Sequence, residues 1–245
     1  MAIRLSKRLT ALAELITPGH RLADIGTDHG YIPIYLCQKN VIPSAIAMDI
    51  GKGPLQQAMA HIGQQGLSDR IETRLSDGLA ALQPGEADTI LIAGMGGGLV
   101  MKILSEGAHA LSGKEELILQ PQSEIAQVRQ YLRVHGMQIV EEEMILEDEK
   151  YYPMMKVILG KEPVSTENKL DEQVEDAFGP VLLQKKHPVL LEWLERELRT
   201  VNSVCDQLNS QPVNERIIIR MAQVQEKKQL ILEALKKYGT ADMQH

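Results

Sequence analysis

Short β-type runs alternate with helical patterns along the first two thirds of the chain, and this alternation restricts the possible folds more than any other feature. The runs occupy residues 21–25, 44–48, 70–75, 89–93 and 117–119. Apolar side chains at helical spacing precede the first run, and Pro54 lies in the first turn of a further helical stretch that continues to Gly66. Strands that alternate with helices form a parallel, doubly wound sheet, so the sequence predicts an α/β fold.

The pattern changes after the fifth run. Residues 138–159 contain two predicted strands around an acidic turn, which indicates an antiparallel hairpin at one edge of the sheet. Residues 161–168 are polar, contain a proline, and are typical of a linker. We therefore expect two domains, residues 1–160 and residues 161–245.

Apolar residues of the second domain recur at alternating three- and four-residue steps over residues 191–208 and 217–238. This spacing predicts an α-helical hairpin with a coiled-coil seam. The connecting turn, residues 209–214, is short, so we expect the seam to close within one chain. A monomer is therefore favoured over a coiled-coil dimer, and no obligate protein partner is evident.

Composition excludes several classes of protein. The 245 residues include 26 basic and 33 acidic side chains, and the net charge of −7 argues against a protein that coats nucleic acid without specificity. Two cysteines rule out a disulfide framework and an all-cysteine zinc site, and seven scattered histidines argue against a zinc enzyme, so we expect no metal. No apolar run approaches the roughly 20 residues of a membrane span, and no signal-peptide pattern occurs. We expect a cytoplasmic protein without membrane contact.

Acidic residues and glycines follow four predicted strands, at the edge where a parallel sheet binds its ligands. They are Asp24, Gly26, Asp28 and Gly30 after the first strand, Asp49 after the second, Asp77 and Gly78 after the third, and Gly94, Met95, Gly96 and Gly97 after the fourth. Each residue taken alone could equally be a turn or a helix cap. Four such strand ends in register favour a cofactor site.

Asp28 distinguishes between the possible cofactors. A dinucleotide needs backbone N–H groups around its pyrophosphate, and a carboxylate at the middle glycine position would repel both phosphates. S-adenosylmethionine carries an ammonium and a sulfonium group and no phosphate. Asp24 and Asp28 could accept hydrogen bonds from that ammonium, while Gly26 and Gly30 would let the methionine tail approach the backbone.

The next two strand ends suit the nucleoside part of the same cofactor. Asp49 follows Asp24 by 25 residues, and an acid near this spacing binds ribose hydroxyls in this kind of sheet. Asp77 could accept a hydrogen bond from the adenine amino group. A nucleotide-binding P-loop is excluded, because the chain has no G-x-x-x-x-G-K-[ST] motif.

Five segments together resemble a known family. They are LSKRL at 5–9, ADIGTDHGYIPIYL at 23–36, DGL at 77–79, IAGMGGGL at 92–99 and LILQPQ at 117–122. Through Gly160 the chain resembles the TrmK family of bacterial tRNA (adenine-22-N1)-methyltransferases, and the helical hairpin is similar to that family's coiled-coil C-terminal domain. The resemblance implies a class I methyltransferase with a Rossmann-like sheet, S-adenosylmethionine as donor, S-adenosylhomocysteine as product, and tRNA as acceptor.

The resemblance also implies roles for individual residues. It places Asp24, Gly26, Asp28 and Gly30 in the methionine-binding loop, Asp49 at the ribose, Asp77 and Gly78 at the adenine, and Gly94, Met95, Gly96 and Gly97 beside the methyl group. Gln122 stands where the family more often has Asn, and Asp49 where it often has Glu. Both differences are conservative and affect only fine contacts.

The segment after the fourth strand indicates which nitrogen is methylated. Enzymes that methylate an exocyclic amine usually place Asp/Asn-Pro-Pro-aromatic there, whereas this chain has Gly-Met-Gly-Gly. Adenine N1 has a free lone pair and attacks without losing a proton, and its cationic product favours a nearby acid. We expect catalysis mainly by positioning, with Asp28, His29, Tyr31 and Met95 as candidate catalytic residues. His29 could equally belong to a helix start, and Tyr31 to the core.

Exposing a base of folded tRNA costs on the order of a few kcal/mol, so phosphate contacts are expected to compensate. Candidate substrate-binding residues of the first domain are Arg4, Lys7, Arg8, Gln120 and Gln122. Those of the second domain are Lys185, Lys186, Lys227, Lys228, Lys236 and Lys237. Any single lysine could equally belong to a solvated helix face.

Without the resemblance, the residues leave other functions open. A methyltransferase that acts on a small molecule or a protein suits the low net basicity. A non-catalytic interaction protein on the same fold is a further alternative, although the intact acids at the strand ends argue against it. A Ser-His-Asp hydrolase is disfavoured because no G-x-S-x-G motif occurs.

Overall fold

The computed structural model describes residues 3–160 and 168–239. The chain divides into two compact units, residues 1–164 and residues 165–245. The predicted linker at 161–168 lies outside the described residues except for Asn168, whose side chain caps a helix of the second unit. No helix among the described residues is long and apolar enough to cross a membrane.

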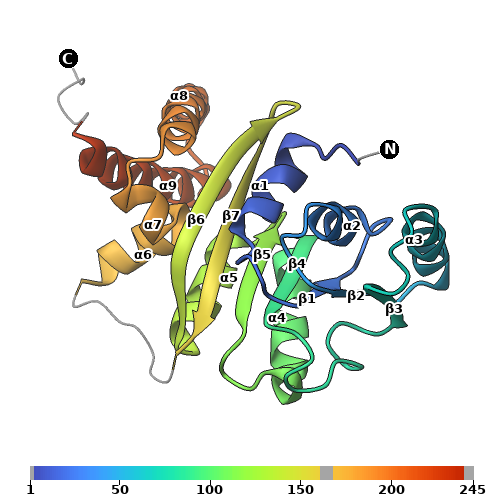
Figure 1. Ribbon diagram of the computed structural model, residues 1–245. Coiled ribbons are helices and arrows are strands. Elements are labelled where there is room, and N and C mark those ends of the chain that lie inside the picture. The colour runs from blue at the N-terminus through green and yellow to red at the C-terminus, as the bar shows by residue number, and fades with distance from the viewer. Residues whose placement is uncertain (1–2, 161–167, 240–245) are drawn as a thin grey trace. The chain divides into compact units, whose positions relative to one another are not determined.

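The first unit contains a seven-stranded sheet with the strand order β3-β2-β1-β4-β5-β7-β6 (Figure 1). The strands are β1 (Leu22–Ile25), β2 (Ala45–Asp49), β3 (Ile71–Leu75), β4 (Thr89–Met95), β5 (Glu116–Pro121), β6 (Met137–Glu147) and β7 (Lys150–Leu159). The first five are parallel, and β7 runs antiparallel to both β5 and β6. The predicted doubly wound sheet with an antiparallel edge hairpin is therefore confirmed. Strand order reverses between β1 and β4, where an open sheet of this kind binds its ligand.

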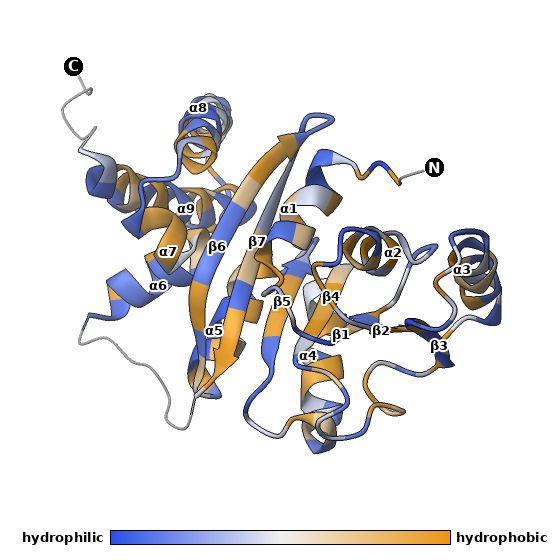
Figure 2. Cartoon of the chain, viewed as in Figure 1, coloured by the Kyte–Doolittle hydropathy of each residue, from blue (hydrophilic) through white to orange (hydrophobic). Residues whose placement is uncertain are grey.

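Helices cover both faces of this sheet. Three of them, α1 (Lys7–Leu15), α2 (Tyr31–Gln38) and α3 (Lys52–Gln64), pack against one face. On the other face lie α4 (Gly97–Glu106) and α5 (Ile125–Val134), and a short 3-10 turn, η1 (Ala108–Ala110), follows α4. Successive strand residues point to opposite faces, so Leu22 joins one core and Ala23 the other. All four residues of β1 are buried, as a strand covered on both faces requires, and the central strands are accordingly hydrophobic in Figure 2.

Helix α1 is fixed to the sheet at both ends. At its first turn, the Glu147 carboxylate accepts hydrogen bonds from the backbone N–H groups of Lys7 (2.7 Å) and Arg8 (3.3 Å). Just beyond its last turn, the Thr17 hydroxyl donates to the buried Glu116 carboxylate at 2.7 Å. Lys156 binds the same carboxylate at 3.0 Å and also donates to the backbone of α1. These contacts hold the helix against β5, β6 and β7.

Strand β4 is two residues longer than the sequence predicts, because a bulge extends it. The pairing with β5 shifts register between Ala93 and Met95, and Gly94 within the bulge has φ +79°. Only glycine adopts this conformation without strain. Gly94 and Met95 therefore belong to the strand, whereas the sequence placed them in the loop that follows it.

The second unit is α-helical. It contains α6 (Lys169–Phe178), α7 (Pro180–Gln184), α8 (Pro188–Asn209) and α9 (Glu215–Tyr238). The predicted helical hairpin is confirmed as α8 and α9, and Val201, Val224 and Ile231 are buried in it. The shorter helices α6 and α7 were not predicted. The coiled-coil seam remains a prediction, and at the tip of the hairpin Ile218 and Ile219 are exposed.

Candidate functional site

A cavity of about 310 Å³ opens at the carboxyl ends of β1 and β4, where the strand order reverses. The predicted site residues that line it are Arg8, Asp24, Gly26, Asp28, Tyr31, Gly94 and Gln122. They come from α1, β1, α2, β4 and the loops after β1 and β5. Residues predicted for cofactor and for substrate thus share one cavity.

Asp24 is the buried acid of this cavity. Its side chain accepts a hydrogen bond from the Thr27 hydroxyl at 2.6 Å, and the residue is 8% exposed. Burial raises the pKa of Asp24 from 3.8 to about 6; the Thr27 hydrogen bond opposes this rise, and the negative charges of Asp49 and Asp28 add to it. The charges of Asp49 and Asp28 therefore disfavour an ionised Asp24, and a cation bound beside Asp24 would relieve this repulsion.

Asp28 and His29 contact each other through their side chains at the mouth of the cavity. His29 Nε2 lies 3.1 Å from Asp28 Oδ1, and the Asp28 side chain is 85% exposed. His29 and Gly30 both have left-handed backbone angles, φ +58° and φ +69°. Helix α2 begins directly after them with Gly30 as its N-cap, so neither Asp28 nor His29 caps it.

The His29 ring stacks with the rings of Tyr31 and His61. The His29 ring lies 5.3 Å from Tyr31 and 5.2 Å from His61, measured between ring centroids. His61 Nδ1 is 3.2 Å from the His29 carbonyl oxygen. His61 lies 32 residues farther along the chain, and nothing in its local pattern on α3 indicates this contact.

Gly26, which lines the cavity, is in contact with the side chain of Met95. A Cβ atom at Gly26 would collide with the terminal methyl of Met95, and Gly26 has φ +72°. The left-handed backbone angle favours glycine at this position, and the missing side chain lets the Met95 methyl lie against it. Met95 and Gly26, predicted from different strand ends, are therefore brought together.

The end of β2 contributes an acid and an apolar side chain. Asp49 Oδ1 accepts a hydrogen bond from the Gly51 N–H at 2.6 Å. Ile50 between them is 68% exposed, so its apolar side chain is available beside this acid. Ile50 was not predicted as a site residue, although it directly follows Asp49 in the sequence.

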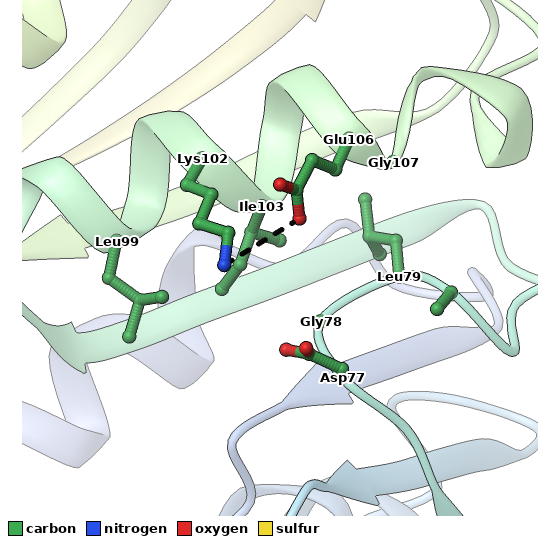
Figure 3. A pocket seen from close by; sticks show the side chains of 9 residues that line it. Asp77, Gly78, Leu79, Leu99, Lys102, Ile103, Glu106 and Gly107 are labelled. Atoms are coloured by element: carbon green, nitrogen blue, oxygen red, sulfur yellow. Dashed lines mark ion pairs between the residues drawn. The ribbon is translucent and has the colours of Figure 1, made fainter.

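Asp77 and Gly78 line a separate, smaller cavity of about 80 Å³ together with residues of α4 (Figure 3). Gly78 has φ +54°, and a Cβ atom there would lie 3.0 Å from the Ile103 side chain. Lys102 and Glu106 pair with each other above this loop at 3.9 Å. The Ser76 N–H binds the Asp49 carbonyl at 2.9 Å, which joins the ends of β2 and β3.

The loops after β4 and β5 are bound to each other. The Gln122 N–H donates to the Met95 carbonyl at 2.8 Å, and the Glu124 carboxylate accepts from the Gly98 N–H at 2.9 Å. A Cβ atom at Gly97 would lie 2.5 Å from the Ser123 carbonyl oxygen, so the two backbones touch. These contacts make one continuous wall from the two loops.

The other predicted residues lie outside the lining of the two cavities. Gln120 is fully buried and accepts a hydrogen bond from Arg8 Nη1 at 3.0 Å. Arg4 and Lys7 are exposed. Gly30 and Gly96 precede α2 and α4 as their N-caps. Among residues 3–160 and 168–239, no group of three or more His, Cys, Asp or Glu side chains could hold a metal ion.

Comparison with known proteins identifies this arrangement. The sequence model of TrmK, tRNA (adenine(22)-N(1))-methyltransferase, matches residues 22–233. The chain belongs to the TrmK family. It is 33% identical over 233 residues to the tRNA (adenine(22)-N(1))-methyltransferase of Bacillus subtilis, an alignment that covers 95% of this chain and 98% of that protein.

Solved TrmK-family structures share the fold and have been obtained with the cofactor. Streptococcus pneumoniae Sp1610 in complex with S-adenosyl-L-methionine matches at a TM-score of 0.80 and 33% identity, over 95% of this chain and all of that one. Mycoplasma capricolum TrmK in complex with S-adenosyl-homocysteine matches at a TM-score of 0.79 and 29% identity, over 95% and 98% of the two chains. The predicted class I methyltransferase sheet is confirmed.

The site in this TrmK-family chain has the chemistry that S-adenosylmethionine requires. The acids Asp24, Asp28 and Asp49 suit a cationic ligand. Gly26 lines the cavity without presenting a side chain to it. The exposed side chain of Ile50 beside Asp49 offers an apolar surface for a nucleoside.

Proposed function

We propose that this protein transfers the methyl group of S-adenosylmethionine to N1 of an adenine in tRNA, the adenine at position 22. The observation that carries the proposal is the acid-lined cavity at the strand-order switch of a TrmK-family sheet. Bound S-adenosylmethionine supplies an electrophilic methyl group. All other requirements fall on the residues of the chain, which must hold the donor, orient the base and exclude competing acceptors.

The placement of the side chains supports an assignment of the cofactor contacts. Asp24 and Asp28 line the cavity from β1 and the loop after it, and we assign them to the ammonium group. Asp49 is assigned to the ribose hydroxyls, and the exposed Ile50 to one face of the adenine. Asp77 is assigned to the adenine amino group.

Gly30, Gly78, Gly94 and Gly96 complete the proposed cofactor site through their backbone. Gly30 ends the methionine-binding loop, and Gly78 follows the adenine-binding acid. Gly94 lies in the bulge of β4, and a Cβ atom at this position would lie near the side chains of Gln122 and Arg8. A side chain at Gly94 would enter the cavity, whereas side chains at Gly30 and Gly78 would press on Ile34 and Ile103 and shift the loops that carry the neighbouring acids.

The acceptor side of the cavity suits a ring nitrogen. Adenine N1 needs no base to remove a proton, and Gly94–Gly97 offers no side chain that would accept from an exocyclic amine. Asp28 lines the cavity and provides negative charge near the position where the methylated base becomes cationic. Tyr31 lines the same cavity and offers a ring for stacking, and Met95 lies beside Gly26. Catalysis then arises mainly from positioning.

The tRNA contacts extend over both domains, residues 1–160 and 161–245, in our proposal. Arg4 and Lys7 are exposed on and before α1, and Gln122 lines the cavity. In the second domain, Lys227 pairs with Glu197 at 2.5 Å and Lys237 with Asp171 at 3.5 Å. Such exposed pairs are weak, so phosphate groups can compete for these lysines. The protein would act as a cytoplasmic monomer.

The test uses labelled S-adenosylmethionine with an unmodified tRNA transcript that has adenine at position 22, and with a matched transcript that has guanine there. We expect label in the first transcript and N1-methyladenosine after nucleoside analysis. Label that persists in the guanine transcript would contradict the assigned position. Transfer to a small molecule or protein in place of tRNA would contradict the proposal as a whole.

A further inference from the structure

Arg8 lies in the cavity and not on the open surface. Its side chain is half-buried and lines the same cavity as Asp24 and Asp28. Nη1 donates a hydrogen bond to Gln120 Oε1 at 3.0 Å, and Gln120 has no exposed surface. The guanidinium carbon lies 5.7 Å from the centroid of the Tyr152 ring, a cation–π contact.

The position of Arg8 is fixed through the backbone as well as the side chain. The Glu147 carboxylate binds the N–H groups of Lys7 and Arg8, and the Thr17 and Lys156 contacts hold the far end of the same helix. A guanidinium held in this way has already lost most of its conformational freedom. A ligand that binds this guanidinium therefore pays only a small entropic cost for ordering the side chain.

The charge of Arg8 has no acidic partner within ion-pair distance in the described part of the chain. Its hydrogen-bond acceptor, the Gln120 amide oxygen, is neutral, which leaves most of the five guanidinium N–H donors available. Arg8 is also the one basic side chain among the described residues that line this cavity, alongside the acids Asp24 and Asp28. One fixed cation and two acids in a single cavity are complementary to the zwitterionic end of an amino acid.

We propose that Arg8 binds the α-carboxylate of S-adenosylmethionine, a contact that rests on the proposed function of the site. Asp24 and Asp28 bind the ammonium group of the same amino-acid end. A tRNA phosphate is the competing anion, and the sequence prediction grouped Arg8 with the phosphate contacts. A phosphodiester brought into this cavity would be repelled by both acids, whereas an amino acid brings its own ammonium group to neutralise them.

The experiment compares S-adenosylmethionine with decarboxylated S-adenosylmethionine, which keeps the ammonium and sulfonium groups and lacks only the carboxylate. Dissociation constants are measured by calorimetry for the wild-type chain and for Arg8→Gln. We expect Arg8→Gln to lower the affinity for S-adenosylmethionine on the order of 10- to 100-fold, because a hydrogen bond between charged groups is lost. Binding of the decarboxylated compound should change little, because the group that Arg8 contacts is missing.

Lys7→Gln provides the matched control, since it removes one positive charge from the adjacent, exposed position of the same helix. It should leave the affinity for both cofactors unchanged and affect only tRNA binding. Arg8→Lys should restore part of the S-adenosylmethionine affinity, because it keeps the charge without the planar donor pair. Circular dichroism and thermal unfolding of each variant establish that it is folded.

Three results would overturn the assignment. If Arg8→Gln lowered the affinity for both compounds equally, the substitution would have damaged the cofactor site as a whole, and Arg8 would not contact the carboxylate. Unchanged affinity for S-adenosylmethionine together with weaker tRNA binding would show that Arg8 contacts phosphate, and the proposed methylation would stand. A wild-type chain that does not bind S-adenosylmethionine would contradict the proposed function together with this contact.

Discussion

Replacement of Asp24 by Asn should stabilise the protein while it strongly weakens cofactor binding. The two side chains have nearly the same shape, and the Asn carbonyl oxygen can still accept the hydrogen bond from Thr27. What the substitution removes is a negative charge that is buried beside two other acids. In the absence of a ligand that charge opposes folding, and with the ligand bound it attracts the ammonium group.

The magnitude follows from the raised pKa. Burial raises the pKa of Asp24 from 3.8 to about 6 in the folded state. A raised carboxyl pKa means that the folded state favours the protonated form, so stability falls as the pH rises from 3.8 through 6 and stays reduced above it. At about 1.4 kcal/mol for each pKa unit, the loss approaches ~3 kcal/mol above about pH 6. Asp24→Asn should recover most of it at about pH 8 and nothing below about pH 4.

Two measurements test this reasoning. Urea unfolding of both chains at about pH 4 and about pH 8 gives the stability difference at each pH. Calorimetry at about pH 8 gives the affinity for S-adenosylmethionine, which should fall on the order of 100-fold or more in the variant. In the wild-type chain the affinity should also decline as the pH is lowered through about 6, because only the ionised carboxylate attracts the ammonium. An Asp24→Asn variant that is less stable than wild type in the alkaline measurement, or that binds the cofactor normally, would refute the reasoning.

Three further substitutions test separate parts of the structure. Asp28→Ala should lower kcat about 100-fold or more while the free energy of unfolding changes by less than about 1 kcal/mol, and comparable losses of both would contradict a catalytic role. Gly97→Ala should destabilise the first unit by about 1–3 kcal/mol in urea unfolding, since its Cβ would overlap the Ser123 carbonyl; unchanged stability would disprove that contact. Glu142→Ala should lower the free energy of unfolding by about 3–5 kcal/mol, because it breaks a buried ion pair of 3.0 Å with Arg129. A decrease of less than about 1 kcal/mol would argue against a buried pair.

Much of the first unit could be predicted because its signals are local. Short apolar runs such as the one in β1 are typical of strands buried on both faces, and the glycines after them permit the turns that the loops require. The acids at strand ends could be grouped without coordinates, since parallel strands bring their carboxyl ends to one edge. Asp24, Gly26 and Asp28 do line one cavity.

What could not be predicted depends on strand order and on pairing across the sheet. Glu147 reaches the backbone of Lys7 across 140 residues, and no local pattern indicates that contact. Glu142 lies among acids that look solvent-exposed in sequence, yet it is fully buried because Arg129 of α5 neutralises it. Likewise, the stacking of His61 on His29 depends on where α3 packs against the sheet.

The joined loops after β4 and β5 have a consequence for how a folded nucleic acid would be accommodated. The two loops are joined by backbone hydrogen bonds, and their backbones touch at Gly97, so they have little freedom to bend. Because these loops are rigid, the RNA must undergo the conformational change that docking requires. The enzyme would then discriminate among tRNAs by how readily each one deforms as well as by its nucleotide sequence.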